Sequence, residues 1–292
     1  MKTEKENLRK VIESKIDNKD LYALNRCIEN MYGKEGFGLY KYGYLEDIKE
    51  ITNEAITEYY KKLVNEAKID IYISGNFDEE ILKKLLEKNL EKINPRKENI
   101  VINNFLTECK ENVENPNEIQ EEMNINQGKL VIGLDVFETS ENMQYKTIIY
   151  NAILGNGANS MLFQNVREKA GLAYTARSTY NKMKNNIFIS CGIEIKNFEK
   201  AVDIIKEQLN NLKNSKFTDE DLQNAKQFII SGIKSIEAEQ DTEIVFYIGQ
   251  EISKINMSIN EYMTNIEKIT REDIIEVANN VQINTIFFLK GI

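Results

Sequence analysis

Two segments of the 292-residue chain share one pattern of residues and expected elements. They are IKEITNEAITEYYKKLVNEAKIDIYISG at 48–75 and IEKITREDIIEVANNVQINTIFFLKG at 266–291. Each starts I-x-x-I-T-x-E, continues as a helix with Thr52 or Thr270 as its expected N-cap, and ends in a β-rich run closed by glycine. Helix starts resemble one another by chance, but the shared order of elements favours duplication. The offset, 266 − 48 = 218 residues, therefore predicts two copies of one unit.

The duplication predicts the domain organisation. A second copy that opens with the expected strand KLVIGLDV, at 129–136, has its first-copy counterpart at 129 − 218 = −89, so the first lobe is expected to be incomplete at its N-terminus. We expect a partial first lobe at 1–93, a linker at 94–124 that holds both prolines, and a second lobe at 125–292.

The second lobe alternates strand and helix signals without a regular βαβ order. LAYTARSTY and NIFISCGIEI alternate like half-buried antiparallel strands, NTIFFLKG reads as a closing strand, and helical spacing recurs at 145–153, 197–212, 218–239 and 260–267. This order predicts an α+β fold in which each lobe is a mostly antiparallel sheet with helices packed on one face.

Composition excludes several function classes. The chain contains no histidine, so it cannot supply a Ser-His-Asp triad, a Cys-His pair or a histidine-bearing zinc site. Its three cysteines, Cys27, Cys109 and Cys191, are far apart and unpaired in pattern, which suits a reducing cytoplasm. A net charge of −9 without a basic stripe argues against nucleic acid, and no apolar run approaches the roughly 20 residues that span a membrane.

The glycine-rich stretch GNGANS, at 155–160, has two interpretations. It partly resembles a dinucleotide-binding fingerprint, but that motif must follow a strand and open a helix. Here a helical pattern precedes the stretch and another follows it, with Ser160 as the expected N-cap. A turn between two helices is the better prediction, and no P-loop sequence is present.

Arg167 and Tyr174 are the candidate functional residues. Arg167 is expected near the end of a helix, Gly171 just past that end, and Tyr174 early in the next strand, so a tight turn could bring both side chains to one rim. Both heads donate hydrogen bonds, which suits a developing oxyanion or a peptide backbone. The competing interpretation pairs Arg167 with Glu168 and packs Tyr174 on the sheet.

The stretch LGNGANSMLFQNVREKAGLAY, at 154–174, resembles the L-G-x-G-x-x-S-x-L-F-x-x-x-R-E-K-x-G-L-A-Y signature of the pitrilysin family of zinc peptidases, which includes insulin-degrading enzyme. The resemblance extends over nearly the whole chain. It implies two halves, each of two α+β lobes, that close on a peptide. One half carries the zinc motif H-x-x-E-H and a distant glutamate ligand, and the other contributes the arginine and tyrosine that bind substrate near the zinc.

The chain departs from the active pattern of that family. H-x-x-E-H is absent, and the resemblance places Lys15 where active members carry the third ligand, although a shift of two residues would place Glu13 there. A protonated lysine cannot bind zinc. The pattern D-N-K-x-x-Y-A-x-x-R, at 17–26, is similar to a zinc-less bacterial subgroup that occurs beside zinc-bearing partners.

These observations predict a non-catalytic half of a cytoplasmic zinc metallopeptidase. The chain would bind no cofactor itself, and Arg167 and Tyr174 would bind peptide substrate beside the zinc of a homologous partner subunit. Two alternatives stay open, a truncated active peptidase and a purely structural assembly homologue.

Overall fold

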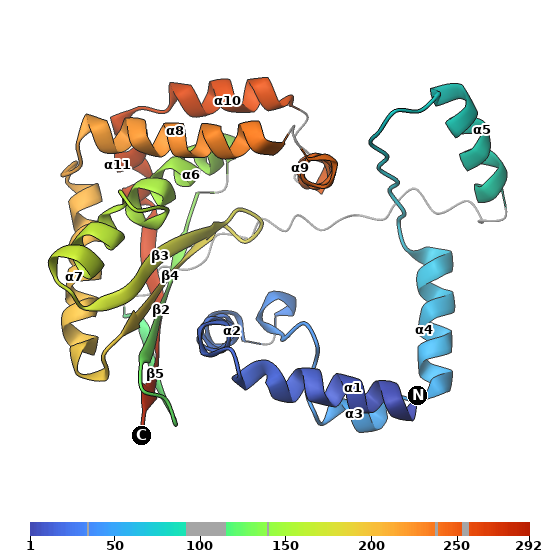
Figure 1. The fold of residues 1–292 in the computed structure, drawn as a ribbon, viewed down its shortest axis with the longest axis horizontal. Coiled ribbons are helices and arrows are strands. Elements are labelled where there is room, and N and C mark those ends of the chain that lie inside the picture. The colour runs from blue at the N-terminus through green and yellow to red at the C-terminus, as the bar shows by residue number, and fades with distance from the viewer. Residues whose placement is uncertain (34, 92–114, 139, 237–238, 253–256) are drawn as a thin grey trace.

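We describe the fold from a computed structural model, whose described residues are 1–33, 35–91, 115–138, 140–236, 239–252 and 257–292. The N-terminal part is helical (Figure 1). Its elements are α1 (Lys2–Glu13), η1 (Ser14–Ile16), α2 (Lys19–Tyr32), η2 (Gly36–Gly38), α3 (Asp47–Glu50), α4 (Asn53–Glu66) and α5 (Glu79–Leu90). No helix in these ranges is both long enough and apolar enough to cross a membrane.

The C-terminal part is built on a five-stranded sheet with the order β1-β5-β2-β4-β3. Its strands are β1 (Asn117–Met123), β2 (Gly128–Val136), β3 (Ala173–Asn181), β4 (Asn186–Ile193) and β5 (Val281–Gly291). Among the described strands, β1 and β5 pair in parallel, and the other three pairs are antiparallel. The predicted α+β fold with a mostly antiparallel sheet is confirmed.

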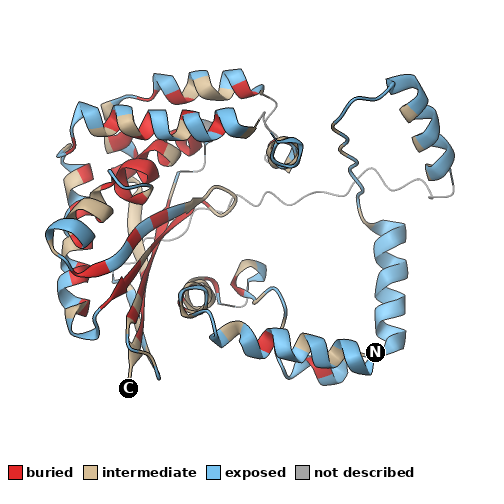
Figure 2. Cartoon of the chain, in the orientation of Figure 1, coloured by how far each residue is buried: buried red, intermediate tan, exposed pale blue. Residues whose placement is uncertain are grey.

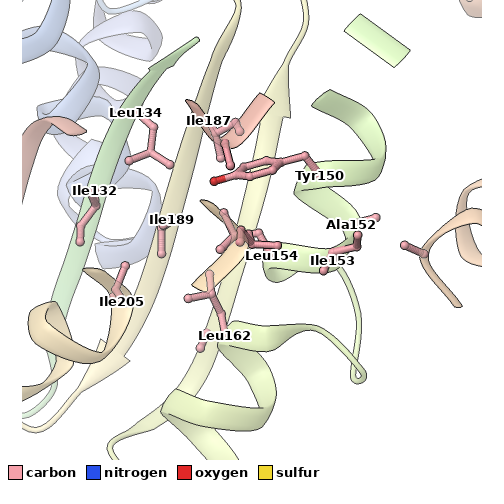
Figure 3. Close-up of a cluster of buried hydrophobic side chains, with 14 of the residues drawn as sticks. Ile132, Leu134, Tyr150, Ala152, Ile153, Leu154, Leu162, Ile187, Ile189 and Ile205 are labelled. Atoms are coloured by element: carbon pink, nitrogen blue, oxygen red, sulfur yellow. The ribbon is translucent and has the colours of Figure 1, made fainter. Parts of the chain in front are cut away.

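Helices cover one face of this sheet (Figure 1). They are α6 (Glu141–Gly155), α7 (Phe198–Lys213), α8 (Asp219–Ile236), α10 (Ile259–Lys268) and α11 (Arg271–Asn279), with α9 (Gln240–Ile252) beside them. Tyr150 and Leu154 of α6 point toward Ile187 and Ile189 of β4 in the core between helices and sheet (Figure 3). Buried residues are concentrated in this lobe (Figure 2), because here the apolar face of each helix packs against the sheet or against another helix.

The opposite face of the sheet is covered by α2, which belongs to the N-terminal part of the chain. Ala23 and Cys27 of α2 are fully buried against Val131 of β2 and Phe287 of β5, in a second apolar cluster separate from the main core. Helices were predicted on one face only. β2 and β4 are buried along almost their whole length, and β5 is buried over 285–289, so these middle strands require a cover on each face.

The predicted linker at 94–124 can be compared with the structure only in its C-terminal part. Its portion up to residue 114 lies outside the described residues, whereas 117–123 forms β1 and hydrogen-bonds to β5. The prediction of a linker is therefore wrong for 117–123. The sequence NEIQEEM carries too few apolar residues to signal a strand, and it is a strand because it occupies an edge of the sheet, with one face toward solvent.

The two copies of the repeated unit differ in burial. Ile56 of α4 aligns with Ile274 of α11 (56 + 218 = 274), but their exposed fractions are 49% and 0%. The glycine that closes each copy gives an offset of 291 − 75 = 216, which aligns Ile71 with Phe287, at 48% and 0%. Residues 67–74 form no hydrogen-bonded strand, contrary to the sequence prediction. In the described part of the chain, the first copy lacks the neighbouring strands that bury β5 in the second.

We predict that Gly133→Val destabilises the protein through the α2 interface. A Cβ atom at Gly133 would lie 2.8 Å from Sδ of Met31, 3.3 Å from Cε1 of Phe188 and 3.4 Å from Sγ of Cys27, so a branched side chain crowds the side chains through which α2 packs on the sheet. Overpacking of this kind costs about 1–3 kcal/mol in the free energy of unfolding. Gly232→Ala is the control, because a Cβ there meets nothing within 4 Å. Equal denaturant midpoints for Gly133→Val and wild type would contradict the docking of α2.

Candidate substrate-binding site

The loop that precedes the site is a turn between helices, as predicted. Residues 155–160 connect the end of α6 to a helical segment that starts at residue 161. Gly155 approaches β3 so closely that a Cβ atom would lie 2.5 Å from the backbone nitrogen of Ser178. Gln164 donates its backbone N–H to the Ser160 carbonyl at 2.9 Å, while the Ser160 hydroxyl donates to the Gly157 carbonyl at 2.7 Å. The hydroxyl therefore holds the turn and does not cap the helix.

The helix that carries Arg167 has π-type hydrogen bonding over η3 (Phe163–Lys169). The helix ends with two backbone hydrogen bonds. The Ala170 N–H donates to the Asn165 carbonyl at 3.2 Å, and the Gly171 N–H donates to the Arg167 carbonyl at 3.1 Å. Gly171 has φ +62°, a conformation that favours glycine, as the sequence predicted for a residue just past a helix end. β3 begins two residues later. π-type segments inside helices are frequent at functional sites.

Arg167 lies on the surface near the end of η3. Its guanidinium carbon is 4.5 Å from the centroid of the Phe163 ring, and its Nε is 3.6 Å from Oε1 of Glu168. The pair with Glu168 is thus present. Both side chains are close to half exposed, so this long contact contributes little to stability and leaves the guanidinium accessible to a ligand.

Tyr174 is 71% exposed, the one large aromatic side chain on β3 that points into solvent to this degree. It lies at the irregularity in the β3–β4 register between Ala173 and Thr175. Within the described part of the chain its side chain makes no hydrogen bond, so its hydroxyl is available as a donor. The interpretation that Tyr174 packs against the sheet does not fit this exposure. Convergence of Arg167 and Tyr174 on one ligand stays a prediction.

Lys15 lies in a charged network under the loop after α2. Its Nζ is 2.5 Å from Oε1 of Glu29 and 4.2 Å from the centroid of the Tyr40 ring, and both charged side chains are only 13% exposed. Removing Glu29 from this largely buried pair would leave the Lys15 ammonium without its counter-ion. Glu13, the alternative ligand position, is on the surface and pairs with Arg9 at 3.1 Å.

The network continues to the sheet through α2. Arg26 bonds Glu29 and donates from Nε to Oε1 of Glu121 at 2.7 Å, and the Tyr22 hydroxyl donates to Oε2 of Glu121 at 3.0 Å. Burial alone would lower the pKa of Arg26, but hydrogen bonds to Glu121 and Glu29 outweigh it and raise that pKa. Burial, with the adjacent Glu121 carboxylate, also raises the pKa of Tyr22.

This network explains the pattern D-N-K-x-x-Y-A-x-x-R, whose role the sequence left open. Asn18 caps α2 by accepting from the Leu21 backbone nitrogen at 3.0 Å, Ala23 allows the helix to lie against β2 and β5, and Tyr22 and Arg26 fasten it to β1. The residues of this pattern therefore hold α2 against the sheet.

The zinc ion that the family resemblance implies does not fit the residues present. Lys15 is engaged as a cation by Glu29, and the described residues include no group of three or more His, Cys, Asp or Glu side chains that could hold a metal. Together, the fold and these residues define a peptidase-like α+β module with an exposed Arg/Tyr motif and without a metal-binding cluster in its described part.

The comparisons agree with that class. Residues 50–229 match the family described as "Peptidase M16 inactive domain". The "Probable inactive metalloprotease YmfF" of Bacillus subtilis (strain 168) is 32% identical over 290 residues, which cover 99% of this chain and 67% of that protein. The chain therefore belongs to the M16 peptidase family and contains its inactive domain.

Solved structures show the same fold. A conserved protein from Enterococcus faecalis V583 superposes with a TM-score of 0.90 at 23% identity, over 100% of this chain and 68% of that one. A chain of complex III2 from Candida albicans superposes with a TM-score of 0.76 at 17% identity, over 98% of this chain and 70% of that one. At these identities the likeness concerns the fold alone.

We predict that the purified chain retains no stoichiometric zinc, because an ammonium paired with a carboxylate occupies the presumed third-ligand position. Elemental analysis after dialysis against trace zinc measures this. Retention of one zinc per chain, lost on mutation of Glu13 to glutamine, would show that Glu13 is the aligned ligand.

We also predict that Arg167→Ala and Tyr174→Phe leave the stability of the chain nearly unchanged. Both side chains are well exposed, and surface substitutions of this kind change the free energy of unfolding by less than about 0.5 kcal/mol. Urea unfolding of the two variants measures this. A loss of more than about 2 kcal/mol in either variant would assign that residue a structural role.

Proposed function

We propose that this chain is the non-catalytic, substrate-binding half of a zinc metallopeptidase, and that Arg167 and Tyr174 hold peptide beside the zinc of a homologous partner subunit. The observation that carries the proposal is the exposure of Tyr174, a phenol at the start of a packed strand that its own lobe leaves uncovered. Burying such a ring usually stabilises a fold, so its exposure on a rigid element suits a residue that contacts a ligand.

The chemistry of the two side chains fits peptide cleavage on another subunit. A guanidinium and a phenol donate hydrogen bonds, and donors placed where negative charge develops stabilise a tetrahedral intermediate. They can also hold a peptide carbonyl in register. Neither group is a nucleophile or a general base here, so the attacking water and its activation belong to the partner.

The partner is expected to be a homologue that carries zinc. This chain has no histidine, and Lys15 is committed to Glu29, so the chain does not supply a zinc site from the positions that the resemblance indicates. The described cysteines, Cys27 and Cys191, are buried free thiols, which suits the reducing cytoplasm that we propose as the compartment.

The two alternatives have unequal support. A truncated active peptidase is disfavoured by the Lys15–Glu29 pair and by the relation to a protein named as probably inactive. An assembly protein without a peptidase role has one specific point in its favour, the shared fold with a chain of complex III2 from Candida albicans. Such a role gives no reason to keep Arg167 and Tyr174 exposed together, so we rank it second.

Reconstitution tests the proposal. The full-length protein and a zinc-bearing homologue from the same genome should each be inactive on an unfolded peptide and active when mixed. In the mixture, Arg167→Ala and Tyr174→Phe should each lower turnover by about a hundred- to a thousand-fold, because loss of one oxyanion donor costs about 3–4 kcal/mol. Size-exclusion chromatography should show unchanged assembly.

Three results would count against this function. Metal-dependent cleavage by the full-length protein alone would assign it an active site. Wild-type turnover by both variants in the mixture would favour the assembly role. A control variant, Lys200→Ala, replaces an exposed lysine on α7 and should cleave at the wild-type rate; if it fails equally, the loss is not specific to the Arg/Tyr motif.

A further inference from the structure

β3 is an edge strand with a free side. In the described part of the chain it pairs only with β4, at the end of the sheet opposite β1. Ala176 and Ser178 are buried toward α6, whereas Arg177 and Thr179 alternate with them and are exposed on the other face. A strand with one unpaired side presents backbone N–H and C=O groups that can pair with another extended chain.

The helix that covers the second face of the sheet stops short of β3. α2 lies over β2 and β5 and reaches β4 at Phe188, which belongs to the same apolar cluster. In the sheet register Thr179 is opposite Phe188, and Arg177 is opposite Ser190. The exposed residues of β3 therefore lie just beyond the margin of α2, on the part of the sheet that this helix leaves open (Figure 1).

The surroundings of β3 are basic in an acidic protein. Between residues 162 and 186 the sequence holds five cations, Arg167, Lys169, Arg177, Lys182 and Lys184, and one anion, Glu168, for a net charge of 5 − 1 = +4. The chain as a whole carries −9, so the remainder carries −13. Cations are thus gathered at both ends of β3 and on its exposed face.

The usual protection of edge strands is weak along β3. Proteins blunt free edges with proline, with lysine on the strand or with bulges. β3 contains no proline and one charge, Arg177, and its irregularity is confined to its start, between Ala173 and Thr175. The remaining register to Asn181 is regular, long enough for a short peptide strand to pair with it.

We propose that β3 binds an extended acidic peptide by strand addition, so that the edge of the sheet holds the peptide backbone and Arg177 pairs with its carboxylates. The proposal names the substrate class of the site proposed above and rests on that function for its biological use. Alternate side chains of an added strand point to the same face as Arg177, so acids at every second position meet the cations.

Two further features fit this occupant. Tyr174 lies at the start of β3, and η3, which carries Arg167, packs against this strand, so a peptide along β3 leads toward both elements. At the other end of β3, Lys184 lies on the α2 side of the sheet, with Nζ 5.9 Å from the centroid of the Tyr32 ring and 5.7 Å from that of Phe37. Carboxylates that point to this face approach Arg177 and Lys184 together. A second copy of the chain could instead offer its acidic edge strand β1, and the experiment separates this case.

Fluorescence anisotropy with the whole chain tests the proposal without a partner subunit. A labelled ten-residue peptide that alternates threonine with glutamate should bind at least about tenfold more tightly than its threonine–lysine counterpart at low salt, and binding should weaken as salt is added. Arg177→Glu should weaken binding of the glutamate peptide about tenfold. Lys200→Glu, the same charge change at an exposed site on α7, should not.

Peptide variants test the strand pairing itself. N-methylation of every second residue blocks one hydrogen-bonding side of the peptide, so one of the two alternating frames should lose binding and the other should keep it. Equal binding of the two frames, equal binding of glutamate and lysine peptides, or equal effects of Arg177→Glu and Lys200→Glu would each overturn the proposal. So would a dimer in sedimentation velocity that Arg177→Glu dissociates, since β1 of a second copy would then be the occupant.

The result is separable from the proposed function. Peptide binding that fulfils these conditions, together with an inactive mixture of subunits, would leave the β3 site intact and remove the peptidase role. Suppose instead that the mixture is active, that Arg177→Glu does not change its rate of cleavage, and that the chain binds neither peptide. The proposed function would then stand, and the β3 site would be excluded.

Discussion

The packing of α2 on the open face of the sheet is the contact on which the rest of the structure depends. A sheet whose middle strands are apolar on both faces cannot fold as an independent lobe with one solvent face. Ala23 and Cys27 provide the flat apolar surface that covers it, and the bonds from Arg26 to Glu121 fix the helix in register with β1. The same helix carries Glu29, which pairs with Lys15, so the residue at the presumed ligand position and the joining of the two parts of the chain share one network.

The candidate site is formed by elements on the other face of the sheet, where α6 packs on β3. α6 packs closely on β3 at Gly155, and this contact positions the turn and η3 that follow. Gly171, with its positive φ, then turns the chain into β3. The outcome is an exposed guanidinium, Arg167, near the end of η3 and an exposed phenol, Tyr174, at the start of an edge strand. Exposure on rigid elements is what substrate positioning requires, because ordered side chains lose little freedom on binding.

Much of this could be predicted from the sequence where local chemistry decides. Thr52 and Thr270 cap their helices as expected, accepting from backbone N–H groups three residues ahead. Gly171 has its positive φ, and β3 follows the predicted alternation, whereas β4 is buried on both faces because α2 covers the second one. The sequence could not indicate β1, whose residues NEIQEEM pair with β5 through tertiary context, nor the burial of Lys15, which arises from residues 14 and 25 positions away in the chain. The π-type hydrogen bonding of η3 could not be predicted from residue spacing, since its apolar residues are spaced as in an α-helix.

Photo-crosslinking from position 174 tests the central claim most directly. A benzophenone amino acid replaces Tyr174 in the full-length protein, which is mixed with its zinc-bearing partner and an unfolded peptide and then irradiated. The account predicts an adduct whose mass equals this chain plus peptide, lost when unlabelled peptide is added in excess. An adduct with the partner subunit alone, equally abundant with and without peptide, would contradict it, because Tyr174 would then be an assembly contact.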